Sequence, residues 1–375
     1  MGTRIIISGG GTGGHIFPAI AIANALKRLA PHAELLFVGA TGKMEMEKVP
    51  AAGYEIVGLD IQGINRTSPW KNIALPFKLY KSIRRARRIV RDFRADVAVG
   101  VGGYASGPLL YAAAGMGVPC LIQEQNSYAG ITNKRLAKRA ARICVAFEGM
   151  ERFFPAHKIL FTGNPIRREA VAIQHKREEA MAFFGLSPAK KTILLTGGSL
   201  GARTLNNSML EGLNRLAAAD VQVIWQCGGY YHDSLRDALG AKYEGSVKLT
   251  AFLQRMDLAY AAADLIIARA GAGTIAELCV VGKPTILVPS PNVAEDHQTK
   301  NAQALVGKSA ALMVTDAEAP RKLIDTALEL LNNAQESGVL RTNLKELAVL
   351  DADEVIAKEV LELAGDGGAT DRNGK

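Results

Sequence analysis

The sequence contains little cysteine. Its 375 residues include four cysteines, Cys120, Cys144, Cys227 and Cys279, and no two of them form a CxxC pair. A cysteine-based zinc or redox motif is therefore not expected, and we predict buried free thiols in a reducing compartment. The first residues also lack the apolar run of a secretory signal, so we expect no export.

Long apolar stretches of the membrane-spanning type are missing as well. The stretch between Asp96 and Glu124 has no charged residue, but it contains six glycines and two prolines. A spanning helix needs about 20 predominantly apolar residues without such interruptions. We interpret this stretch as strand, glycine loop, helix and strand of a soluble core.

Acidic residues are the scarcer charged type. The chain has 45 Lys and Arg against 36 Asp and Glu, which gives a formal net charge of +9. This excess favours anionic partners, such as a phosphorylated substrate, anionic lipid or nucleic acid. Much of it lies in WKNIALPFKLYKSIRRARRIVRDFR, residues 70–94, whose nine basic residues and single acid, Asp92, give +8.

The basic segment 70–94 has a helical pattern. Its apolar residues predict a stripe that faces the core, with the arginines on the opposite side; the stripe is Leu79, Ile83, Ala86, Val90 and Phe93. Because Trp70, Ile73, Leu75 and Phe77 lie beside the basic face, we interpret the segment as a surface for an anionic membrane. An ordinary solvated helix is the alternative. No nucleic acid is expected, since base-stacking aromatics and a nucleic-acid module are missing.

Short apolar runs alternate with helical patterns, which predicts parallel α/β sheets. The expected strands are 4–8, 34–39, 96–100, 119–123, 191–196, 221–226, 247–250, 265–268 and 285–289, and a helix is expected over 18–30. Because RIIIS precedes GGGTGGH and KTILLT precedes GGSLGAR, we predict two Rossmann-like domains, 1–163 and 164–365. The last helix either belongs to the second domain or packs back on the first. Residues 366–375 are expected to be a disordered tail.

Three glycine-rich loops follow expected strands, at 9–14, 100–108 and 197–203. The first spells GxGxxG, but the next strand ends FVGAT, without the acid of a dinucleotide fingerprint. The GKS at 307–309 is not a phosphate-binding Walker loop, because Ala302 stands where that motif needs glycine. A single glycine loop is often only a tight turn. Three at strand ends favour phosphate binding by backbone N–H groups and helix N-termini.

Three side-chain patterns leave structural and functional interpretations open. His15 follows the first loop and is either a general base or a partner of a local carbonyl. Thr274 and Glu277 match a capping box, which would explain Glu277 structurally. The alternative has Glu277 bind a ribose diol. Asp351-Ala-Asp353 resembles a metal-binding DxD, but its distance from the glycine loops favours a solvated helix face, and no metal is expected.

Six segments in this order carry a family resemblance: GGGTGGHIFPAIAIA, GVGGYASGP, QEQNSYAGITNKRLAK, GNPIR, GGSLGAR and ARAGAGTIAE. Over roughly residues 3–350 they closely resemble glycosyltransferase family 28, the undecaprenyl-diphospho-muramoylpentapeptide N-acetylglucosaminyltransferases of peptidoglycan synthesis. The resemblance implies a GT-B fold, with two Rossmann-like domains facing each other across a cleft. It also implies UDP-N-acetylglucosamine as donor, lipid I as acceptor, lipid II as product, and inversion without a metal or cofactor. The expected location is peripheral, on the cytoplasmic face of the bacterial inner membrane.

The resemblance also implies roles for residues of the donor site. Arg167 and Ser199 match diphosphate contacts, and the backbone of Leu253 matches the uracil contact. Gln298 matches a glutamine that holds sugar hydroxyls. The nucleotide segment, with Glu277 on the ribose, is matched by Ala272, Gly273, Thr274, Ile275, Ala276 and Glu277.

On the acceptor side, the resemblance implies that Thr12, Gly13, Gly14 and Asn126 contribute to substrate binding. His15 matches a histidine proposed to assist the acceptor hydroxyl. Two positions depart from the common family pattern, since Gln123 stands where His is common and Ala268 where Ser is frequent. Side-chain roles at these two positions are therefore open.

Two other functions share this architecture. A UDP-N-acetylglucosamine 2-epimerase has no lipid acceptor and does not need the basic segment 70–94. A non-catalytic nucleotide-sugar sensor would bind the donor without transferring the sugar.

Overall fold

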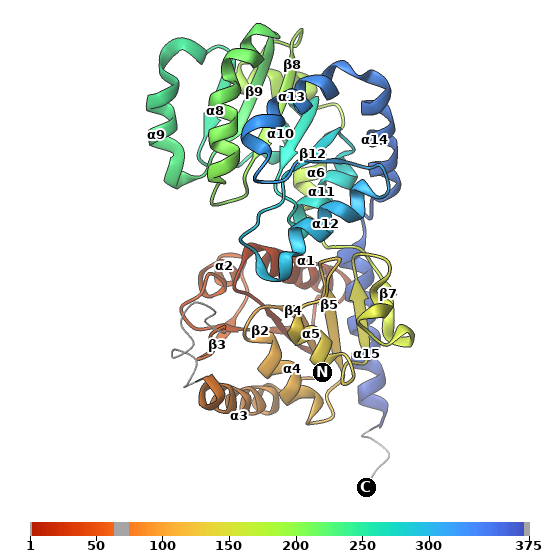
Figure 1. Ribbon diagram of the computed structural model, residues 1–375. Helices are drawn as coiled ribbons and strands as arrows, with labels where there is room; N and C mark the ends of the chain where they lie inside the picture. Colours follow the sequence, from red (N-terminus) through yellow and green to blue (C-terminus); the bar gives the residue numbers. More distant parts are fainter. Residues whose placement is uncertain (1, 64–74, 371–375) are drawn as a thin grey trace. The chain divides into compact units, whose positions relative to one another are not determined.

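The computed structural model describes residues 2–63 and 75–370 of the chain. They divide into two compact units (Figure 1). The first unit is Met1–Ile166 together with Asp351–Lys375, and the second is Arg167–Leu350. The chain thus leaves the first unit after Ile166 and returns to it at Asp351.

A seven-stranded parallel sheet forms the centre of the first unit, in the order β3-β2-β1-β4-β5-β6-β7. Its strands are β1 (Arg4–Gly9), β2 (Glu34–Ala40), β3 (Ile56–Leu59), β4 (Val97–Gly102), β5 (Cys120–Glu124), β6 (Arg142–Val145) and β7 (Ile159–Phe161). Ile5, Ile6 and Ile7 of β1 are fully buried. Consecutive apolar residues are needed there because a parallel sheet is covered on both faces.

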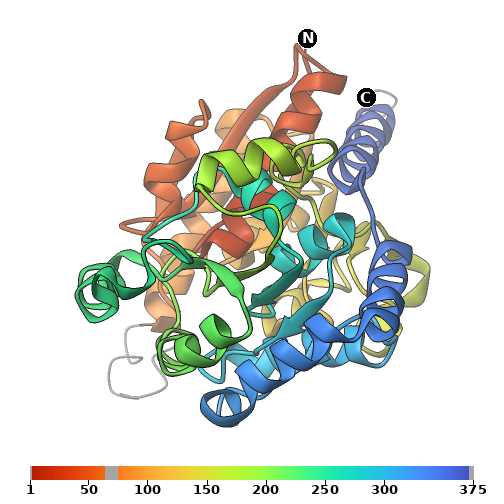
Figure 2. The same cartoon turned by 90° about the horizontal axis from the view of Figure 1, so that it is seen from above.

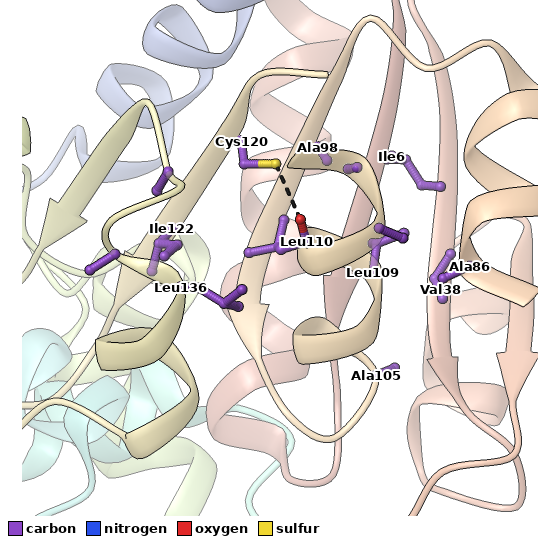
Figure 3. Close-up of a cluster of buried hydrophobic side chains, with 14 of the residues drawn as sticks. Ile6, Val38, Ala86, Ala98, Ala105, Leu109, Leu110, Cys120, Ile122 and Leu136 are labelled. Carbon is purple, nitrogen blue, oxygen red and sulfur yellow. Dashed lines mark hydrogen bonds between the residues drawn. The ribbon is translucent and has the colours of Figure 1, made fainter. Parts of the chain in front are cut away.

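Helices cover this sheet on both faces. They are α1 (Gly13–Leu29), α2 (Glu45–Ala51), α3 (Leu75–Phe93), α4 (Ser106–Ala114), α5 (Ile131–Leu136) and α15 (Ala352–Thr370). Figure 3 shows one of the cores, where Leu109 and Leu110 of α4 pack over the sheet beside Cys120. The Cys120 thiol donates to the carbonyl oxygen of Leu110 at 3.7 Å.

The last helix, α15, lies beside α1 (Figure 2). Arg28 of α1 pairs with Asp353 at 2.7 Å, and Arg142 pairs with Glu359 at 3.3 Å. Asp353 is buried, so the expected solvated face at Asp351-Ala-Asp353 is wrong for Asp353, while Asp351 is exposed. The helix continues to Thr370. The prediction of a disordered tail is therefore wrong for 366–370, and 371–375 lie outside the described residues.

The second unit has a six-stranded parallel sheet in the order β10-β9-β8-β11-β12-β13. Its strands are β8 (Lys191–Thr196), β9 (Val221–Gln226), β10 (Val247–Thr250), β11 (Leu265–Ala268), β12 (Thr285–Leu287) and β13 (Leu312–Met313). Its helices are α6 (Arg168–Val171), α7 (Arg177–Phe184), α8 (Arg203–Ala218), α9 (Gly229–Leu239), α10 (Met256–Ala262), α11 (Ala272–Val281), α12 (His297–Val306), α13 (Ala319–Asn332) and α14 (Ala334–Glu346). The fully buried Trp225 fills the core under α8 and donates to Asn206 Oδ1 at 3.0 Å.

Every predicted strand is present, four of them with the predicted bounds. Four further strands, β3, β6, β7 and β13, have two to four residues each and were not predicted. The first helix begins at Gly13 instead of Pro18. The four cysteines are buried as free thiols, as predicted. Burial raises the pKa of Cys120, Cys144 and Cys279 to about 12.

Among residues 2–63 and 75–370, no helix combines the length and the apolar character that crossing a bilayer requires.

Candidate functional site

The predicted glycine loops lie where each sheet reverses its strand order. In the first unit the reversal falls between β1 and β4, which the loops at 9–14 and 100–108 follow. In the second it falls between β8 and β11; the predicted loop at 197–203 follows β8, and a turn with Gly271 follows β11. Open parallel sheets bind ligands at this edge, outside the carboxyl ends of the strands. Each unit therefore has one candidate binding edge.

The two loops of the first unit touch through their backbones. Gly10 N–H donates to the carbonyl oxygen of Gly102 at 3.2 Å. Gly103 has φ +93°, and a Cβ atom at this position would lie 2.4 Å from the Gly10 oxygen. Only glycine permits both the backbone conformation and the close approach.

Glu45 stabilises the glycine loop 9–14 through hydrogen bonds to its carboxylate. Its fully buried carboxylate accepts hydrogen bonds from Gly11 N–H at 2.8 Å and from Ala40 N–H at 3.0 Å. A Cβ atom on Gly10 would lie 2.2 Å from Glu45 Oε1, so glycine leaves the space that this carboxylate fills. Glu45 was not predicted, because the acid of a dinucleotide fingerprint stands at the end of β2, whereas Glu45 begins α2.

His15 uses one ring nitrogen for a structural contact. Its Nδ1 lies 3.0 Å from the carbonyl oxygen of Gly10. A carbonyl can only accept, so Nδ1 carries the proton and the neutral ring has its lone pair on Nε2. The imidazole packs against Gly102, where a Cβ atom would lie 2.5 Å from His15 Cδ2. The contact to a local carbonyl is therefore present, and it fixes the tautomer that a general base needs.

Thr12, Gly13 and Gly14 form the N-terminus of α1. Thr12 is the residue before the helix, and its carbonyl oxygen accepts from the N–H groups of His15 and Ile16, both at 3.1 Å. Thr12 and Gly14 are exposed. A helix N-terminus presents N–H groups and positive potential, which suits a phosphate.

Asn126 is positioned by a buried carboxylate. Its backbone N–H donates to Glu124 Oε1 at 3.1 Å, and Glu124 Oε2 also accepts from Gly130 N–H and from Asn133 Nδ2. Next to it, the buried Gln123 side chain donates to Asn164 Oδ1 at 2.9 Å. Gln123 stands where the family commonly has histidine, and its side-chain amide makes a structural contact inside the first unit.

Gln226 connects the glycine loop 197–203 of the second unit to the segment at Ala251 through hydrogen bonds. This side chain at the end of β9 donates from Nε2 to the carbonyl oxygens of Gly198 at 3.0 Å and Ala251 at 3.1 Å. Ser199 lies exposed on the loop, and Leu253, close after Ala251, is buried. Gln226 thus couples the two segments predicted to bind diphosphate and uracil, a role that no sequence pattern indicated.

Arg167 and Glu277 form an ion pair in the second unit. Arg167 Nε lies 3.0 Å from Glu277 Oε1, and Nη2 lies 3.4 Å from Oε2. The fully buried Tyr260 donates its hydroxyl to Glu277 Oε2 at 3.0 Å. Burial, followed by the charge of Glu277, raises the pKa of Tyr260 well above its usual value, so the phenol remains a donor.

The capping-box interpretation of Thr274 and Glu277 is wrong. Gly271 precedes the first helical residue of α11, and Ile275 N–H donates to its carbonyl oxygen at 2.9 Å. Thr274 is therefore inside the helix, and the Glu277 carboxylate bonds to Arg167 and Tyr260 instead of to the helix amides. Ala272, Gly273 and Thr274 occupy the first turn, with Ile275 and Ala276 next.

Gln298 and Arg269 order the ends of neighbouring strands. Gln298, in the first turn of α12, accepts from Ser290 N–H at 2.9 Å through Oε1. Arg269 follows the fully buried Ala268, donates to the carbonyl oxygens of Val288 and Pro289, and pairs with Asp316 at 2.6 Å. In the described part of the chain, no three His, Cys, Asp or Glu residues are grouped as metal ligands.

The basic helix α3 presents its charges outward. Ala86 and Val90 of the predicted stripe are buried and Ile83 and Phe93 are half-buried, but Leu79 is 41% exposed. The stripe prediction is thus wrong for Leu79, which is exposed like Phe77 and Tyr80 in the same turns of α3. Arg84, Arg85, Arg87 and Arg88 are exposed.

The beginning of α3 also exposes aromatic rings. Phe77 is 62% and Tyr80 57% exposed, with Lys81 Nζ 4.4 Å from the Phe77 ring centre. A groove of about 700 Å³ runs along this face between aromatic and basic side chains. The predicted contributions of Trp70 and Ile73 lie outside the described residues.

Comparison with protein families matches both parts of the chain. Residues 5–145 match the glycosyltransferase family 28 N-terminal domain, and residues 192–358 match the family 28 C-terminal domain. A protein of Bacteroides fragilis is 59% identical over 363 residues, with 96% of each chain covered. A protein of Parabacteroides distasonis is 57% identical over 360 residues, covering 96% of this chain and 98% of the relative. Both are named UDP-N-acetylglucosamine--N-acetylmuramyl-(pentapeptide) pyrophosphoryl-undecaprenol N-acetylglucosamine transferase.

Solved structures give the same fold. The crystal structure of Acinetobacter baumannii MurG superposes with a TM-score of 0.78 at 28% identity, covering 96% of this chain and 99% of that one. A putative UDP-N-acetylglucosamine 2-epimerase from Listeria monocytogenes has a TM-score of 0.66 at 13% identity, covering 100% and 99%. The second likeness concerns the fold alone. Two parallel α/β units with these neighbours confirm the predicted GT-B fold class.

Proposed function

The chain belongs to glycosyltransferase family 28, and we propose that it transfers N-acetylglucosamine from UDP-N-acetylglucosamine to lipid I. The acceptor atom is the 4-hydroxyl of the muramoyl pentapeptide, and the product is lipid II. The observation that supports this most strongly is the placement of glycine loops at the strand-order reversal of both sheets. One such edge serves a nucleotide sugar and the other a lipid diphosphate.

On the donor side, the second unit supplies contacts for each part of UDP. Arg167, Ser199 and the N–H groups of the 197–203 loop bind the diphosphate, and the backbone of Leu253 reads the uracil. Glu277 binds the ribose, at the N-terminus of α11 where Ala272, Gly273 and Thr274 lie. Gln298 holds hydroxyls of the sugar. Gln226 supports this site indirectly, since it joins the loop at Gly198 to the segment at Ala251.

On the acceptor side, the first unit holds lipid I. The N-terminus of α1 at Thr12, Gly13 and Gly14 suits its diphosphate. Asn126 adds a side-chain contact. His15 is the general base, because its bond to Gly10 leaves the lone pair on Nε2.

The proposed reaction is a single displacement at C1 of N-acetylglucosamine. The muramoyl 4-hydroxyl gives its proton to His15 Nε2 while its oxygen forms the bond to C1. The bond between C1 and the diphosphate oxygen breaks, and UDP leaves with that electron pair. The Arg167 guanidinium and backbone N–H groups stabilise the charge that develops on the diphosphate. Attack opposite to the leaving group inverts the anomeric carbon.

We also propose that α3 binds an anionic membrane surface and places the enzyme peripherally on the cytoplasmic face of the inner membrane. Its four exposed arginines lie beside the exposed Phe77 and Tyr80. Each basic side chain near an anionic leaflet adds about 1 kcal/mol of attraction. Aromatic rings with one polar edge are suited to the headgroup region.

The decisive test is transfer of labelled N-acetylglucosamine from UDP-N-acetylglucosamine to a lipid I analogue by the full chain. We expect UDP and labelled lipid II to form together, and only when the acceptor is present. Epimerisation of the donor without acceptor would replace this proposal with the isomerase alternative. Saturable UDP-N-acetylglucosamine binding without any transfer would replace it with a nucleotide-sugar sensor.

A further inference from the structure

A cationic pocket lies in the second unit at the C-terminal end of α11. Its volume is about 300 Å³. Ile173, Val280 and Val281 provide apolar wall, and Lys283, Arg341 and Lys345 bring three positive charges. The predicted nucleotide segment lies at the opposite end of the same ten-residue helix, about 15 Å away along its axis. The pocket is therefore separate from the donor site.

The positive charges of this pocket are not neutralised by carboxylates. Among the described residues, Lys283, Arg341 and Lys345 form no ion pair. The charge of Asp264 acts on Lys283 and raises its pKa. Asp264 Oδ2 already pairs with Arg177 at 3.2 Å and accepts from Thr192 N–H at 2.9 Å.

Like charges are also held close together here. Arg341 and Lys345 are four residues apart on α14, the spacing at which equal charges repel on a helix. Lys283 is half-buried. Burial, followed by the charge of Arg177, lowers its pKa, and Arg341 and Lys345 act in the same direction. A bound anion would offset the repulsion among these three basic side chains and so stabilise their arrangement.

The backbone brings Lys345 against the end of α11. Gly282 ends this helix in the left-handed conformation, with φ +60°. A Cβ atom there would lie 2.6 Å from both Cγ and Cε of Lys345, so the lysine stem covers the glycine. A larger residue at 282 would displace the Lys345 side chain from the end of α11.

We propose that this pocket binds a small phosphate-bearing anion. A guanidinium can bond two phosphate oxygens at once, and two ammonium groups add point charges around it. The volume is at the lower end of the range for small-molecule sites, which suits a phosphate with a short substituent. Val280, Val281 and Ile173 give that substituent an apolar surface.

The test is calorimetric titration of the full chain with inorganic phosphate in the presence of saturating UDP, so that the predicted diphosphate site is occupied. Ionic strength is held constant with chloride. We expect saturable binding that weakens at least tenfold in R341Q/K345Q. The matched control is R321Q/K322Q on α13, which removes the same charge from exposed positions of the same unit. It should bind phosphate like the parent.

Two results would overturn the proposal. One is the absence of saturable phosphate binding while UDP is bound. The other is equal weakening by R341Q/K345Q and by R321Q/K322Q, which would mean that net charge alone matters. Phosphatidylglycerol vesicles identify the source of the phosphate group. Vesicle binding reduced by R341Q/K345Q and not by the control indicates a lipid headgroup, whereas unchanged vesicle binding together with lost phosphate binding indicates a soluble ligand.

Discussion

Arg167 and Glu277 contact each other through two N–O distances, 3.0 and 3.4 Å, although 110 positions separate them in the sequence. The arginine is 46% exposed and the glutamate 9%. The proposed donor site assigns the first to the diphosphate and the second to the ribose. Nucleotide binding therefore has to exchange part of this ion pair for contacts to the ligand.

Changing Glu277 should affect the nucleotide more than the fold. We expect E277A to weaken UDP binding by about 1.5–3 kcal/mol, the usual value for hydrogen bonds to a charged group. Titration calorimetry measures the affinity, and thermal unfolding measures stability. The control is Y260F, which removes only the hydroxyl that donates to Glu277. A lower melting temperature with unchanged UDP affinity in E277A would show a purely structural role.

Removing the imidazole of His15 should reduce kcat. For H15A we expect a loss of about 10²- to 10⁴-fold in kcat, the usual contribution of a general base. The KM for UDP-N-acetylglucosamine should change little, since the proposed donor contacts lie in the second unit. Steady-state kinetics with a soluble lipid I analogue separates the two parameters. A raised acceptor KM with normal kcat would make His15 a binding residue only.

Glu45 should be needed to keep the first glycine loop in place. In E45Q the side chain retains one acceptor oxygen but brings an NH₂ group against backbone N–H donors. We expect destabilisation by about 1–3 kcal/mol and a raised KM for the acceptor. Chemical denaturation and kinetics report these effects. E47Q, at an exposed position of the same helix, is the matched control and should change neither.

Reversal of charge on α3 should abolish membrane attraction without affecting chemistry. We expect R84E/R85E/R87E/R88E to lose at least tenfold in affinity for phosphatidylglycerol vesicles. Turnover of a water-soluble acceptor should persist. A charge-matched variant of the second unit, R236E/K242E/R321E/K322E, should retain binding. Vesicle sedimentation provides the readout, and equal binding of all three proteins would reject α3 as the membrane surface.

Acid sensitivity should depend on Asp257. This carboxylate pairs with Lys176 at 2.7 Å and with Arg255 at 2.9 Å. The hydrogen bond from Arg255, together with Lys176, holds the pKa of Asp257 well below its usual value of about 3.9. The stabilisation is therefore complete above the unfolded-state pKa and is lost as the pH falls toward the folded-state pKa.

The variant D257N tests this dependence. It should lower the free energy of unfolding at pH 7 by about 1–3 kcal/mol. Below pH 4 the difference from the parent should shrink, because the Asp257 carboxylate of the unfolded parent takes up a proton there while that of the folded parent stays ionised. Urea denaturation from pH 7 to pH 3 measures it. A constant difference across this range would assign the effect to packing.

Buried parallel strands were predictable because both of their faces are covered. Runs such as Ile5 to Ile7 and Ile193 to Leu195 therefore show as continuous apolar segments. A strand as short as β13, with two residues, is too short to show a pattern. The start of α1 was misplaced because proline normally marks a first turn, whereas here Gly13 and Gly14 precede it inside the helix.

Site residues were predictable only where they lie in a recognisable segment. Glu45 lies 34 positions from Gly11, and Gln226 lies 28 positions from Gly198. These contacts depend on which strands are neighbours in the sheet. The capping-box prediction failed because Gly271, not Thr274, is the residue before the first turn of α11, and the Glu277 carboxylate contacts Arg167 instead.

The return of the chain to the first unit at Asp351 affects how the protein can fold during synthesis. Domains generally fold in the order in which they emerge from the ribosome. In this chain Arg28 of α1 pairs with Asp353, which is synthesised after the whole second unit. The first unit therefore begins to be synthesised first but is completed last. The second unit is an uninterrupted insertion and can finish folding earlier. Cutting the chain after Leu350 would remove α15 and expose the apolar face of α1 that packs against it.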